Sequence, residues 1–461
     1  MSETRTRIQP ARRVAYEVIS AVRESDAYAN LLLPVRLDRA KLSGPDAALA
    51  TELAYGTLRM LGYYDRVIEL AARRPAAQID APILDVLRLG VHQLLSMRVA
   101  QHAAVDEAVS LAREVGSRSA TGFVNGVLRT ITRSSAETWR SLVLAAAAND
   151  DERLAAAHSH PVWIIRAFRR ALAAEGRESE LVALLKADNA APHVSLTVLP
   201  GLSTTAELPG TRPGRFSPFA AVSEGGDPAH WPAVHEGRAR VQDEGSQLAA
   251  LALSRARSIR RGERWLDLCA GPGGKAALLA AEAVTGGATL VANELVPARA
   301  ELVRKALAVF DTPPEVWELD GTTVGASHPR RFDRILLDAP CTGLGALRRR
   351  PEARWRKQPR DVAELAELQI RLLESALDAL APGGILAYVT CSPHPGETQA
   401  VVHSALRNNT DVHTLDTQAV LATATGESLA LPPAEHVQLW PHRHGTDAMF
   451  IQLLAREHPV G

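Results

Sequence analysis

Cysteine, aromatic residues, net charge and long apolar runs are all scarce in this sequence. Its 461 residues contain three cysteines at wide spacing, and aromatic side chains make up 4% of the total. Such a sparse, odd-numbered set of cysteines argues against a disulfide framework and fits a reducing compartment. A formal net charge of +0 excludes a uniformly basic nucleic-acid-binding protein, although it leaves room for local basic patches.

Signals for membranes and for export are missing as well. No segment reaches the roughly 18 uninterrupted apolar residues that a membrane span needs, and the N-terminus lacks the apolar core of a signal peptide. We therefore expect a soluble, cytoplasmic monomer with no membrane partner. The hydrophobic content of 46% over this length is sufficient for two or three domains with large cores.

The first part of the chain has the pattern of packed helices. Val14, Val18, Ile19 and Val22 share one face of a helical period, and similar patterns follow without strand-like alternation. We predict an all-α domain over residues 1–135. Its first residues include a basic cluster that suits RNA phosphates or simply forms a solvated helix face: Arg5, Arg7, Arg12 and Arg13.

The rest of the chain divides into a connecting segment and an α/β domain. We predict a small connecting subdomain over 136–237, with a strand at 194–198 followed by a Pro- and Gly-rich stretch. Over 238–461, strands alternate with helices, which predicts a mostly parallel sheet covered by helices on both faces. The seven expected strands lie at about 264–269, 289–293, 315–319, 333–338, 384–390, 437–440 and 448–454, the last two as an antiparallel pair closing one edge.

A glycine-rich turn follows the first strand of this domain. A P-loop is excluded because Ala276 stands where a Ser or Thr must follow Lys275. A dinucleotide fingerprint is incomplete, and it gives no role to Asp267 before the turn. An acid placed in this way is typical of the S-adenosylmethionine loop of class I methyltransferases. We therefore expect cofactor contacts from the turn itself, Cys269-Ala270-Gly271-Pro272-Gly273-Gly274-Lys275.

Acidic residues at two further strand ends fit the same cofactor. Glu294 ends the second strand, where it could accept hydrogen bonds from ribose hydroxyls, and Asp320 ends the third, where it could border the adenine. The alternative is that both are loop acids without a ligand. The sequence leaves two roles open for Lys275, a contact to the cofactor or a contact to the substrate. No metal site is predicted.

Two cysteines follow two other strands of the predicted sheet. Cys341 lies in Asp338-Ala339-Pro340-Cys341-Thr342-Gly343, and Cys391 lies in Thr390-Cys391-Ser392. Buried cysteines are often small hydrophobic residues, but these two stand in polar loops at the sheet edge where α/β proteins bind ligands. Cys269 ends a strand directly before the glycine turn, so packing is its expected role.

A thiolate beside a methyl donor has a specific use. Carbon 5 of a pyrimidine is too weak a nucleophile to take a sulfonium methyl group unaided. A thiolate that adds at carbon 6 turns the ring into an enamine and makes carbon 5 reactive. Asp338 is the candidate for holding the base edge and stabilising the charge that develops.

These loops together resemble those of the NOL1/NOP2/Sun family of RNA 5-methylcytosine methyltransferases. The likeness continues in Val241–Ser246, before the catalytic domain, and in the loop Pro441–Asp447. Phe123–Arg129 resembles part of a NusB-like RNA-binding domain. The resemblance implies a class I (Rossmann-like) methyltransferase domain behind a NusB-like helical domain, S-adenosylmethionine as cofactor, and a cytosine of small-subunit ribosomal RNA as substrate.

The resemblance also implies a role for each thiol. Cys391 would be the nucleophile, Cys341 would assist release of the enzyme–RNA adduct, and Asp338 would hold the cytosine. The geometry expected from the sequence alone leaves an exchange of the two cysteine roles open. Transfer RNA is the alternative substrate. A non-catalytic ribosome-assembly factor would be expected to have damaged loops, and a nucleotide-dependent oxidoreductase would explain neither cysteine loop.

A basic segment with a tryptophan follows the Cys341 loop. Basic residues interleaved with an aromatic side chain suit phosphate contacts and a stacked base, so we expect residues 348–360 to contact RNA. A solvated basic loop is the alternative. The basic residues and the tryptophan are Arg348, Arg349, Arg350, Arg354, Trp355, Arg356, Lys357 and Arg360.

Overall fold

The structure is a computed structural model that describes residues 8–25 and 27–458. The chain forms two compact units, one helical and one built around a large sheet. The helical unit comprises Met1–Arg169, Ser179–Ala190 and Leu347–Arg356, and the sheet unit comprises Arg170–Glu178, Ala191–Ala346 and Lys357–Gly461. The segment predicted as a connecting subdomain, 136–237, is therefore divided between the two units.

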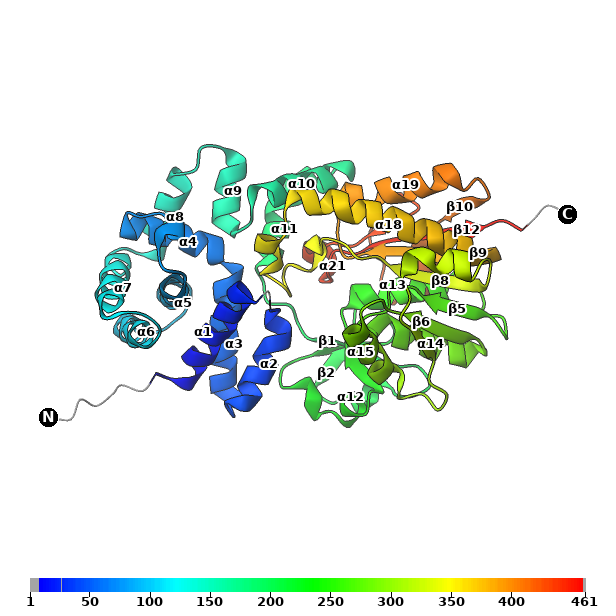
Figure 1. Ribbon diagram of the computed structural model, residues 1–461, viewed down its shortest axis with the longest axis horizontal. Coiled ribbons are helices and arrows are strands. Elements are labelled where there is room, and N and C mark those ends of the chain that lie inside the picture. Colours follow the sequence, from blue (N-terminus) through cyan, green and yellow to red (C-terminus); the bar gives the residue numbers. More distant parts are fainter. Residues whose placement is uncertain (1–7, 26, 459–461) are drawn as a thin grey trace. The chain divides into compact units, whose positions relative to one another are not determined.

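The helical unit is a bundle (Figure 1). Its helices over residues 10–145 share one apolar core. The predicted apolar face of the first helix is confirmed, because Val14, Val18, Ile19 and Val22 are all buried. The sequence pattern missed α2, which contains Pro34 and leaves Leu31 67% exposed. The helices that belong wholly to this unit are α1 (Pro10–Glu24), α2 (Ala29–Arg39), α3 (Gly44–Arg59), α4 (Leu61–Ala72), α5 (Ala81–Ser96), α6 (Gln101–Val115), α7 (Arg118–Ile131), α8 (Ala136–Ala145), α9 (Asp150–His158), α11 (Leu181–Asp188) and α17 (Ala353–Arg356). The residues of α10 (Val162–Ala174) are divided between the two units after Arg169.

The segment Leu347–Arg356 is part of the helical unit, although it follows the Cys341 loop in the chain. Arg354 is fully buried there. Its Nη1 donates to the carbonyl oxygens of Arg59 and Ser159 at 3.2 and 2.9 Å, and to Asn189 Oδ1 at 2.9 Å. The expectation that Arg354 contacts RNA phosphates is wrong, because its guanidinium is inside the protein and already hydrogen-bonded.

Other members of the predicted basic clusters also have partners inside the helical unit. Arg356 donates to the carbonyl oxygens of Val22 and Ala27, both at 2.6 Å. At the start of the chain, Arg12 donates to Gln93 and Arg13 pairs with Glu114. Arg5 and Arg7 lie outside the described residues. Exposed members of the 348–360 segment include Arg350, Trp355 and Arg360.

The sheet unit is organised by a mostly parallel sheet, as predicted. The strand order is β10-β12-β9-β8-β5-β6-β7, and β11 pairs with β12 as an eighth strand. The pairs of β8 with β9, β5 with β8, β5 with β6 and β6 with β7 are parallel. The strands are β5 (Arg264–Asp267), β6 (Thr289–Asn293), β7 (Glu315–Trp317), β8 (Phe332–Asp338), β9 (Leu380–Thr390), β10 (Val412–Leu415), β11 (Val437–Gln438) and β12 (Phe450–Arg456).

One predicted feature of this sheet is wrong. The last two strands were expected to close an edge as a pair, but β12 lies inside the sheet, antiparallel to both β9 and β10. The outermost strand is β10, which the sequence pattern did not reveal. Its four residues include only one that is buried, Val412, so no clear alternation marks it.

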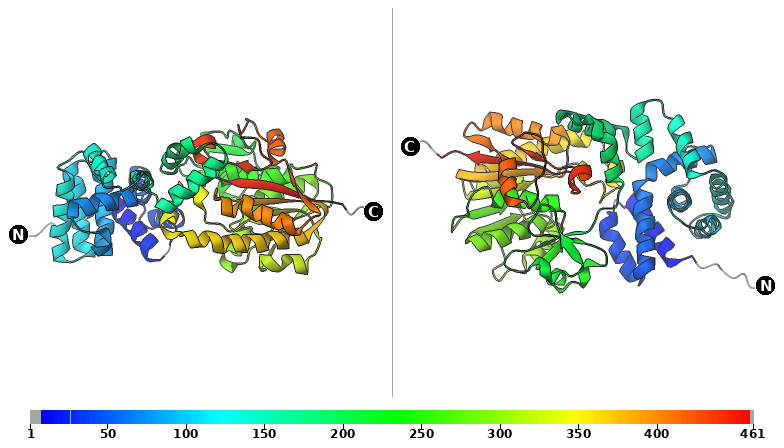
Figure 2. Two further views of the ribbon diagram at one scale, coloured as in Figure 1. Left: turned by 90° about the horizontal axis from the view of Figure 1, so that it is seen from above. Right: turned by 180° about the vertical axis from the view of Figure 1, so that it is seen from behind.

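Alternating residues of the central strands pack into two separate apolar cores, one on each face of the sheet. In β9, Leu386 and Tyr388 pack in the core that includes α18 and α19, whereas Ala387 and Val389 pack in the core that includes α13 and α14. This is the period of two expected for a strand with both faces covered. Figure 2 shows α18 as a long helix along one side of the sheet. The helices of this unit are α12 (Pro232–His235), α13 (Glu244–Ser254), α14 (Gly274–Gly286), α15 (Pro297–Leu307), α16 (Val324–Ser327), α18 (Pro359–Ala379), α19 (Gln399–Asn408), α20 (Thr417–Ala424) and α21 (Pro441–His444).

A second, smaller sheet belongs to the same unit. Its four antiparallel strands have the order β2-β3-β1-β4. The expected strand at 194–198 is present as β1 (Ser195–Val198), and the others are β2 (Thr211–Pro213), β3 (Ala220–Ser223) and β4 (Ala239–Val241). Within the described ranges of both units, no helix has the length and apolar character that crossing a bilayer requires.

Replacing Arg354 with alanine should destabilise the helical unit. The change leaves several buried carbonyl oxygens without a donor, which we expect to cost about 3 kcal/mol of unfolding free energy. Urea unfolding followed by circular dichroism measures the loss. Arg360→Ala is the control, because this exposed side chain has only a long contact to Asp361 at 3.9 Å. An Arg354→Ala transition that coincides with that of the wild type would contradict the prediction.

Candidate active site

The candidate site lies where the parallel strands β5, β6, β8 and β9 end. Asp267 of β5 is opposite Ala292 of β6 and Leu336 of β8, and Asp338 of β8 is opposite Val389 of β9. The loops after these strands therefore leave the sheet at the same edge. This arrangement gathers the glycine turn, Glu294, the Cys341 loop and the Cys391 loop, as the sequence predicted.

The glycine turn connects β5 to α14 through a closely packed bend. Gly273 has φ +103°, a conformation that other residues rarely adopt, and a Cβ at this position would lie 2.6 Å from Ala306 Cβ. A Cβ on Gly271 would lie 2.3 Å from Glu294 Oε2. Position 273 therefore requires glycine, whereas a side chain at position 271 would have to displace the carboxylate of Glu294. The first amide groups of α14 stand directly behind the turn.

Glu294 is held against this turn. Its Oε2 accepts a hydrogen bond from the Gly271 amide at 3.1 Å, and its Oε1 accepts one from the Val296 amide at 3.0 Å. Arg299 donates to the Gly271 carbonyl oxygen at 2.8 Å and lies 3.2 Å from the same carboxylate. Arg299 was missed from the sequence, since a lone arginine on a helix gives no signal of such a contact.

Asp267 is fully buried behind the turn, and its environment is unusual for an acid. Burial, with a further contribution from the charge of Asp338, raises its pKa to about 8, although Lys275 and the nearby Cys269 amide act in the opposite direction. Among the described residues, neither of its carboxylate oxygens accepts a well-formed hydrogen bond. A buried acid without a donor suits a cationic or hydrogen-bond-donating ligand group.

Lys275 and Asp338 form an ion pair across the site. Lys275 Nζ lies 2.7 Å from Asp338 Oδ2. Burial disfavours the ammonium group, but the charge and hydrogen bond of Asp338, together with the charges of Cys391 and Asp267, outweigh it and raise the Lys275 pKa. The lysine therefore remains cationic and places a positive charge between the glycine turn and the cysteine loops.

The two cysteines singled out from the sequence meet in the structure. Cys341 Sγ and Cys391 Sγ are 3.4 Å apart. The pKa of Cys341 is raised, first by its hydrogen bond to Cys391, then by burial and by the charges of Cys391, Glu397 and Asp338. The two thiols therefore share a hydrogen bond, and their surroundings disfavour ionisation of Cys341.

The remaining predicted residues lie at the rim of the site or in the core. Asp320 is exposed and caps the short turn after β7, where its Oδ1 accepts hydrogen bonds from Thr322 N at 2.9 Å and Thr322 Oγ1 at 2.8 Å. These bonds lower its pKa. Cys269 packs against an apolar core, and burial raises its pKa, so its thiol is suited to packing.

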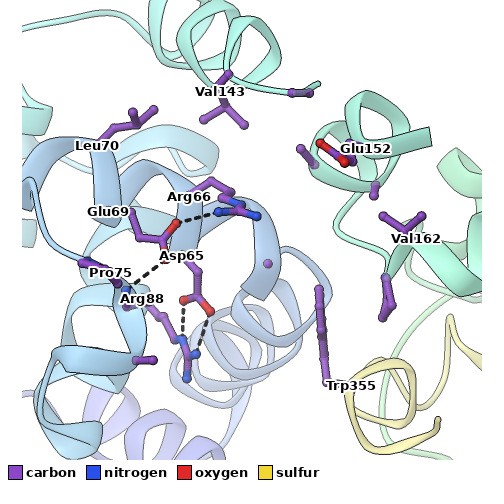
Figure 3. Close-up of a pocket in the computed structure, with 18 of the residues that line it drawn as sticks. Asp65, Arg66, Glu69, Leu70, Pro75, Arg88, Val143, Glu152, Val162 and Trp355 are labelled. Carbon is purple, nitrogen blue, oxygen red and sulfur yellow. Dashed lines mark hydrogen bonds and ion pairs between the residues drawn. The ribbon is translucent and has the colours of Figure 1, made fainter. Parts of the chain in front are cut away.

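A cavity of about 980 Å³ lies within the helical unit (Figure 3). Its exposed rim includes Arg66, Arg73 and Arg74. Trp355, 38% exposed, stands at its edge, where its ring packs over Gly62. Arg88 lines the cavity too, but Asp65 binds its guanidinium at 2.7 and 2.8 Å, so this arginine supports the fold.

Comparison with known proteins gives two family matches and several relatives. A family described as 16S rRNA methyltransferase RsmB/F matches residues 256–455, and the NusB family matches residues 9–133. The chain is 49% identical to a Mycobacterium tuberculosis protein named as a methyltransferase, over 97% of both chains. It is 30% identical to the ribosomal RNA small subunit methyltransferase B of Erwinia tasmaniensis, over 97% of this chain and 98% of that protein.

Solved structures agree with the fold. The crystal structure of PH0851 matches with a TM-score of 0.79 at 21% identity, covering 97% of this chain and 99% of that chain. The structure of NSun6 from Pyrococcus horikoshii with SFG matches with a TM-score of 0.52 at 16% identity, covering 63% of this chain and 98% of that chain. At these identities the likeness concerns the fold alone.

Asp267 should make the unfolding free energy depend on pH. Its folded pKa of about 8 lies above the value near 4 of an unfolded aspartate, so the folded state holds a proton that the unfolded state has released. Between about pH 4 and 8, this group therefore lowers stability as pH rises, by up to about 1.4 kcal/mol per pH unit. Asp267→Asn cannot titrate and removes this slope.

Urea unfolding of the wild type and of Asp267→Asn at pH 5.5, 6.5 and 7.5 tests this prediction. The variant should gain stability relative to the wild type with each step in pH. Two curves that stay parallel over this range would show that the carboxyl group is ionised throughout.

Proposed function

Because the chain belongs to the RsmB/F family of 16S rRNA methyltransferases, we propose that it methylates carbon 5 of a cytosine in small-subunit ribosomal RNA. The observation that carries this proposal is the pair of Cys341 and Cys391, with Sγ atoms 3.4 Å apart at the sheet edge. Thiols in this position are needed for covalent activation of a pyrimidine, and most other methyl acceptors do not require them.

S-adenosylmethionine is the proposed cofactor, and it would supply the methyl group. The residues present fit it, since the turn from Cys269 to Lys275 offers close backbone approach and Asp267 offers carboxylate oxygens without a donor. Glu294 would receive the ribose hydroxyls, and Asp320 would border the adenine from the rim. Asp267 would hold a cationic group of the cofactor.

The proposed reaction assigns a different task to each thiol. The Cys391 thiolate adds to carbon 6 of the cytosine, which makes carbon 5 nucleophilic. With S-adenosylmethionine bound, the electron pair of the carbon 5–carbon 6 bond would form the new bond to the methyl group, while the methyl–sulfur bond breaks and its electrons stay on the sulfur of the departing S-adenosylhomocysteine. Loss of the carbon 5 proton restores that double bond, and the bond between Cys391 and carbon 6 breaks, which releases the thiolate. Cys341 is proposed to assist this release. Its Sγ lies 3.4 Å from Cys391 Sγ, and the direction of its pKa shift, which disfavours its thiolate form, is consistent with this assignment.

Asp338 is proposed to hold the edge of the target cytosine. Its ion pair with Lys275 at 2.7 Å keeps the carboxylate in place before the base arrives. A carboxylate at the base edge accepts a hydrogen bond from the exocyclic amine and stabilises charge in the ring. In this proposal Lys275 acts through Asp338, which favours a role beside the substrate over a simple cofactor contact.

The helical unit is proposed to provide a second RNA contact. Exposed Arg66, Arg73 and Arg74 around the cavity suit phosphates, and Trp355 at its edge suits a stacked base. The target cytosine itself must leave any helix to reach a thiolate, so we expect a single-stranded or flipped base. The match of residues 9–133 to the NusB family supports assigning RNA binding to this domain.

Ribosomal RNA is favoured over transfer RNA because the Erwinia tasmaniensis relative, named for the small ribosomal subunit, matches over 97% of this chain, helical domain included. A substrate of this kind would place the protein in the cytoplasm. A non-catalytic assembly factor is disfavoured because both cysteine loops are intact. An oxidoreductase would use neither thiol.

Mapping of 5-methylcytosine in ribosomal and transfer RNA tests the proposal. RNA from cells that lack this protein should have lost the modification at a small-subunit ribosomal RNA site, and the purified wild-type protein with S-adenosylmethionine should restore it. Cys391→Ala should restore none, because no thiolate adds to carbon 6. Unchanged 5-methylcytosine at every site in the deleted cells would refute the proposal, and loss in transfer RNA alone would change its substrate.

Replacing the other thiol should separate the two roles. Cys341→Ala should accumulate a covalent protein–RNA adduct, visible as a slower band on a denaturing gel, because Cys391 still adds but release is impaired. The double variant with Cys391→Ala should form none. An adduct that forms in Cys391→Ala and not in Cys341→Ala would reverse the assignment.

A further inference from the structure

A buried carboxylate links the loops that carry the two thiols. Glu397 ends the short 3₁₀ turn η7 (Pro395–Glu397) and is fully buried. Its Oε1 accepts a hydrogen bond from Thr342 N at 2.7 Å, and its Oε2 accepts one from Thr342 Oγ1 at 2.5 Å and one from Ser392 Oγ at 2.6 Å. Thr342 follows Cys341 and Ser392 follows Cys391, so one side chain holds the neighbour of each thiol.

Further hydrogen bonds keep this carboxylate from moving. Gln369 of α18 donates through Nε2 to the Pro340 carbonyl oxygen at 2.8 Å and to Glu397 Oε1 at 3.4 Å. The Tyr388 hydroxyl donates to the Glu397 carbonyl oxygen at 2.7 Å and to Gln369 Oε1 at 3.2 Å. Thr342, Gln369, Tyr388, Ser392 and Glu397, all buried, are together called the Glu397 network.

Packing alone does not explain why a carboxylate occupies the centre of the Glu397 network. Burying a charge is costly unless donors surround it, and apolar residues of the same volume would fill this space at lower cost. Here the donors come from both cysteine loops. Other contacts between these loops are the hydrogen bond from Gly345 N to the Cys391 carbonyl oxygen at 2.8 Å, the contact of Thr342 Oγ1 with Ser392 Oγ at 3.3 Å and the contact between the two Sγ atoms. Without the carboxylate, the residues after Cys341 and Cys391 would lose their common acceptor.

We propose that Glu397 is a positioning residue that fixes the separation and orientation of the two catalytic thiols. The proposal rests on the proposed function, because it assigns Glu397 to the step in which Cys391 adds and to the step in which Cys341 assists release. Reacting groups must be held to within fractions of an ångström, so freeing either loop lowers the rate of chemistry more than it lowers binding. Among the described residues, the hydrogen bonds of the Glu397 carboxylate come from Thr342, Gln369 and Ser392, none of which belongs to the glycine turn.

The test measures steady-state methylation of the ribosomal RNA substrate by Glu397→Gln. The amide has the same shape, but its NH₂ group cannot accept hydrogen bonds from Thr342 or Ser392. We expect kcat to fall on the order of 100-fold, while KM for RNA and the Kd for S-adenosylmethionine stay within about twofold. Built into Cys341→Ala, the same change should slow adduct formation by a similar factor.

Glu282→Gln is the matched control. Glu282 is a buried carboxylate of the same unit that accepts hydrogen bonds from Ser254 at 3.0 Å and Arg255 at 2.8 Å, and neither of these partners belongs to a cysteine loop. It should lose stability as Glu397→Gln does, but keep wild-type kcat per folded molecule. The pair Thr342→Val and Thr342→Ser gives a second comparison. The valine, which lacks the hydroxyl, should lower kcat about tenfold, and the serine should not.

The outcomes separate the two proposals. A wild-type protein that methylates no RNA would refute the proposed function. An active wild type, with Glu397→Gln at wild-type kcat per folded molecule, would refute the positioning role alone. A loss in Glu397→Gln that only matches the loss in Glu282→Gln would also refute it, because burial of any carboxylate would then explain the effect.

Discussion

The parallel pairing of β8 with β9 is the constraint on which the candidate site depends. Adjacent strands are about 4.8 Å apart, and the register places Asp338 opposite Val389. Short loops after these strand ends therefore place the Sγ atoms of Cys341 and Cys391 3.4 Å apart. No long flexible segment is needed to bring the two thiols together. A shift of one residue in this register would turn every β9 side chain to the other face, so the apolar cores on both faces also fix the thiols.

The charges at this edge depend on the same geometry. Three acids lie among these strand ends and loops, Asp267, Asp338 and Glu397, and each has different neighbours. Asp338 has Lys275 as a partner, Glu397 has donors from both cysteine loops, and Asp267 has no well-formed hydrogen bond among the described residues. Burial therefore raises the pKa of Asp267 to about 8, and this acid is suited to receive a ligand group that the protein itself does not supply.

The parts of the site that short sequence motifs mark could be predicted from the sequence. The glycine turn, the strand ends and the two cysteine loops are each visible within a few residues, and strand adjacency follows from the βα rhythm. Family matches confirm the resemblance that these loops suggested. Glu397 and Arg299 were missed because their partners lie far away in the chain, and Glu397 bonds to Thr342 across 55 positions. The edge strand β10 was missed because it has only one buried residue.

The basic segment after Cys341 shows why charge is a weaker guide than local pattern. An arginine can donate to a phosphate or to a backbone carbonyl oxygen, so the presence of an arginine in the sequence does not tell which acceptor it meets. Burial decides the matter here, because Arg354 satisfies carbonyl oxygens inside the helical unit while Arg350 and Arg360 are exposed. The part of this segment that belongs to the helical unit, within Leu347–Arg356, is therefore held there by hydrogen bonds from its arginines. Only its exposed groups, Trp355 included, are left to meet a nucleic acid.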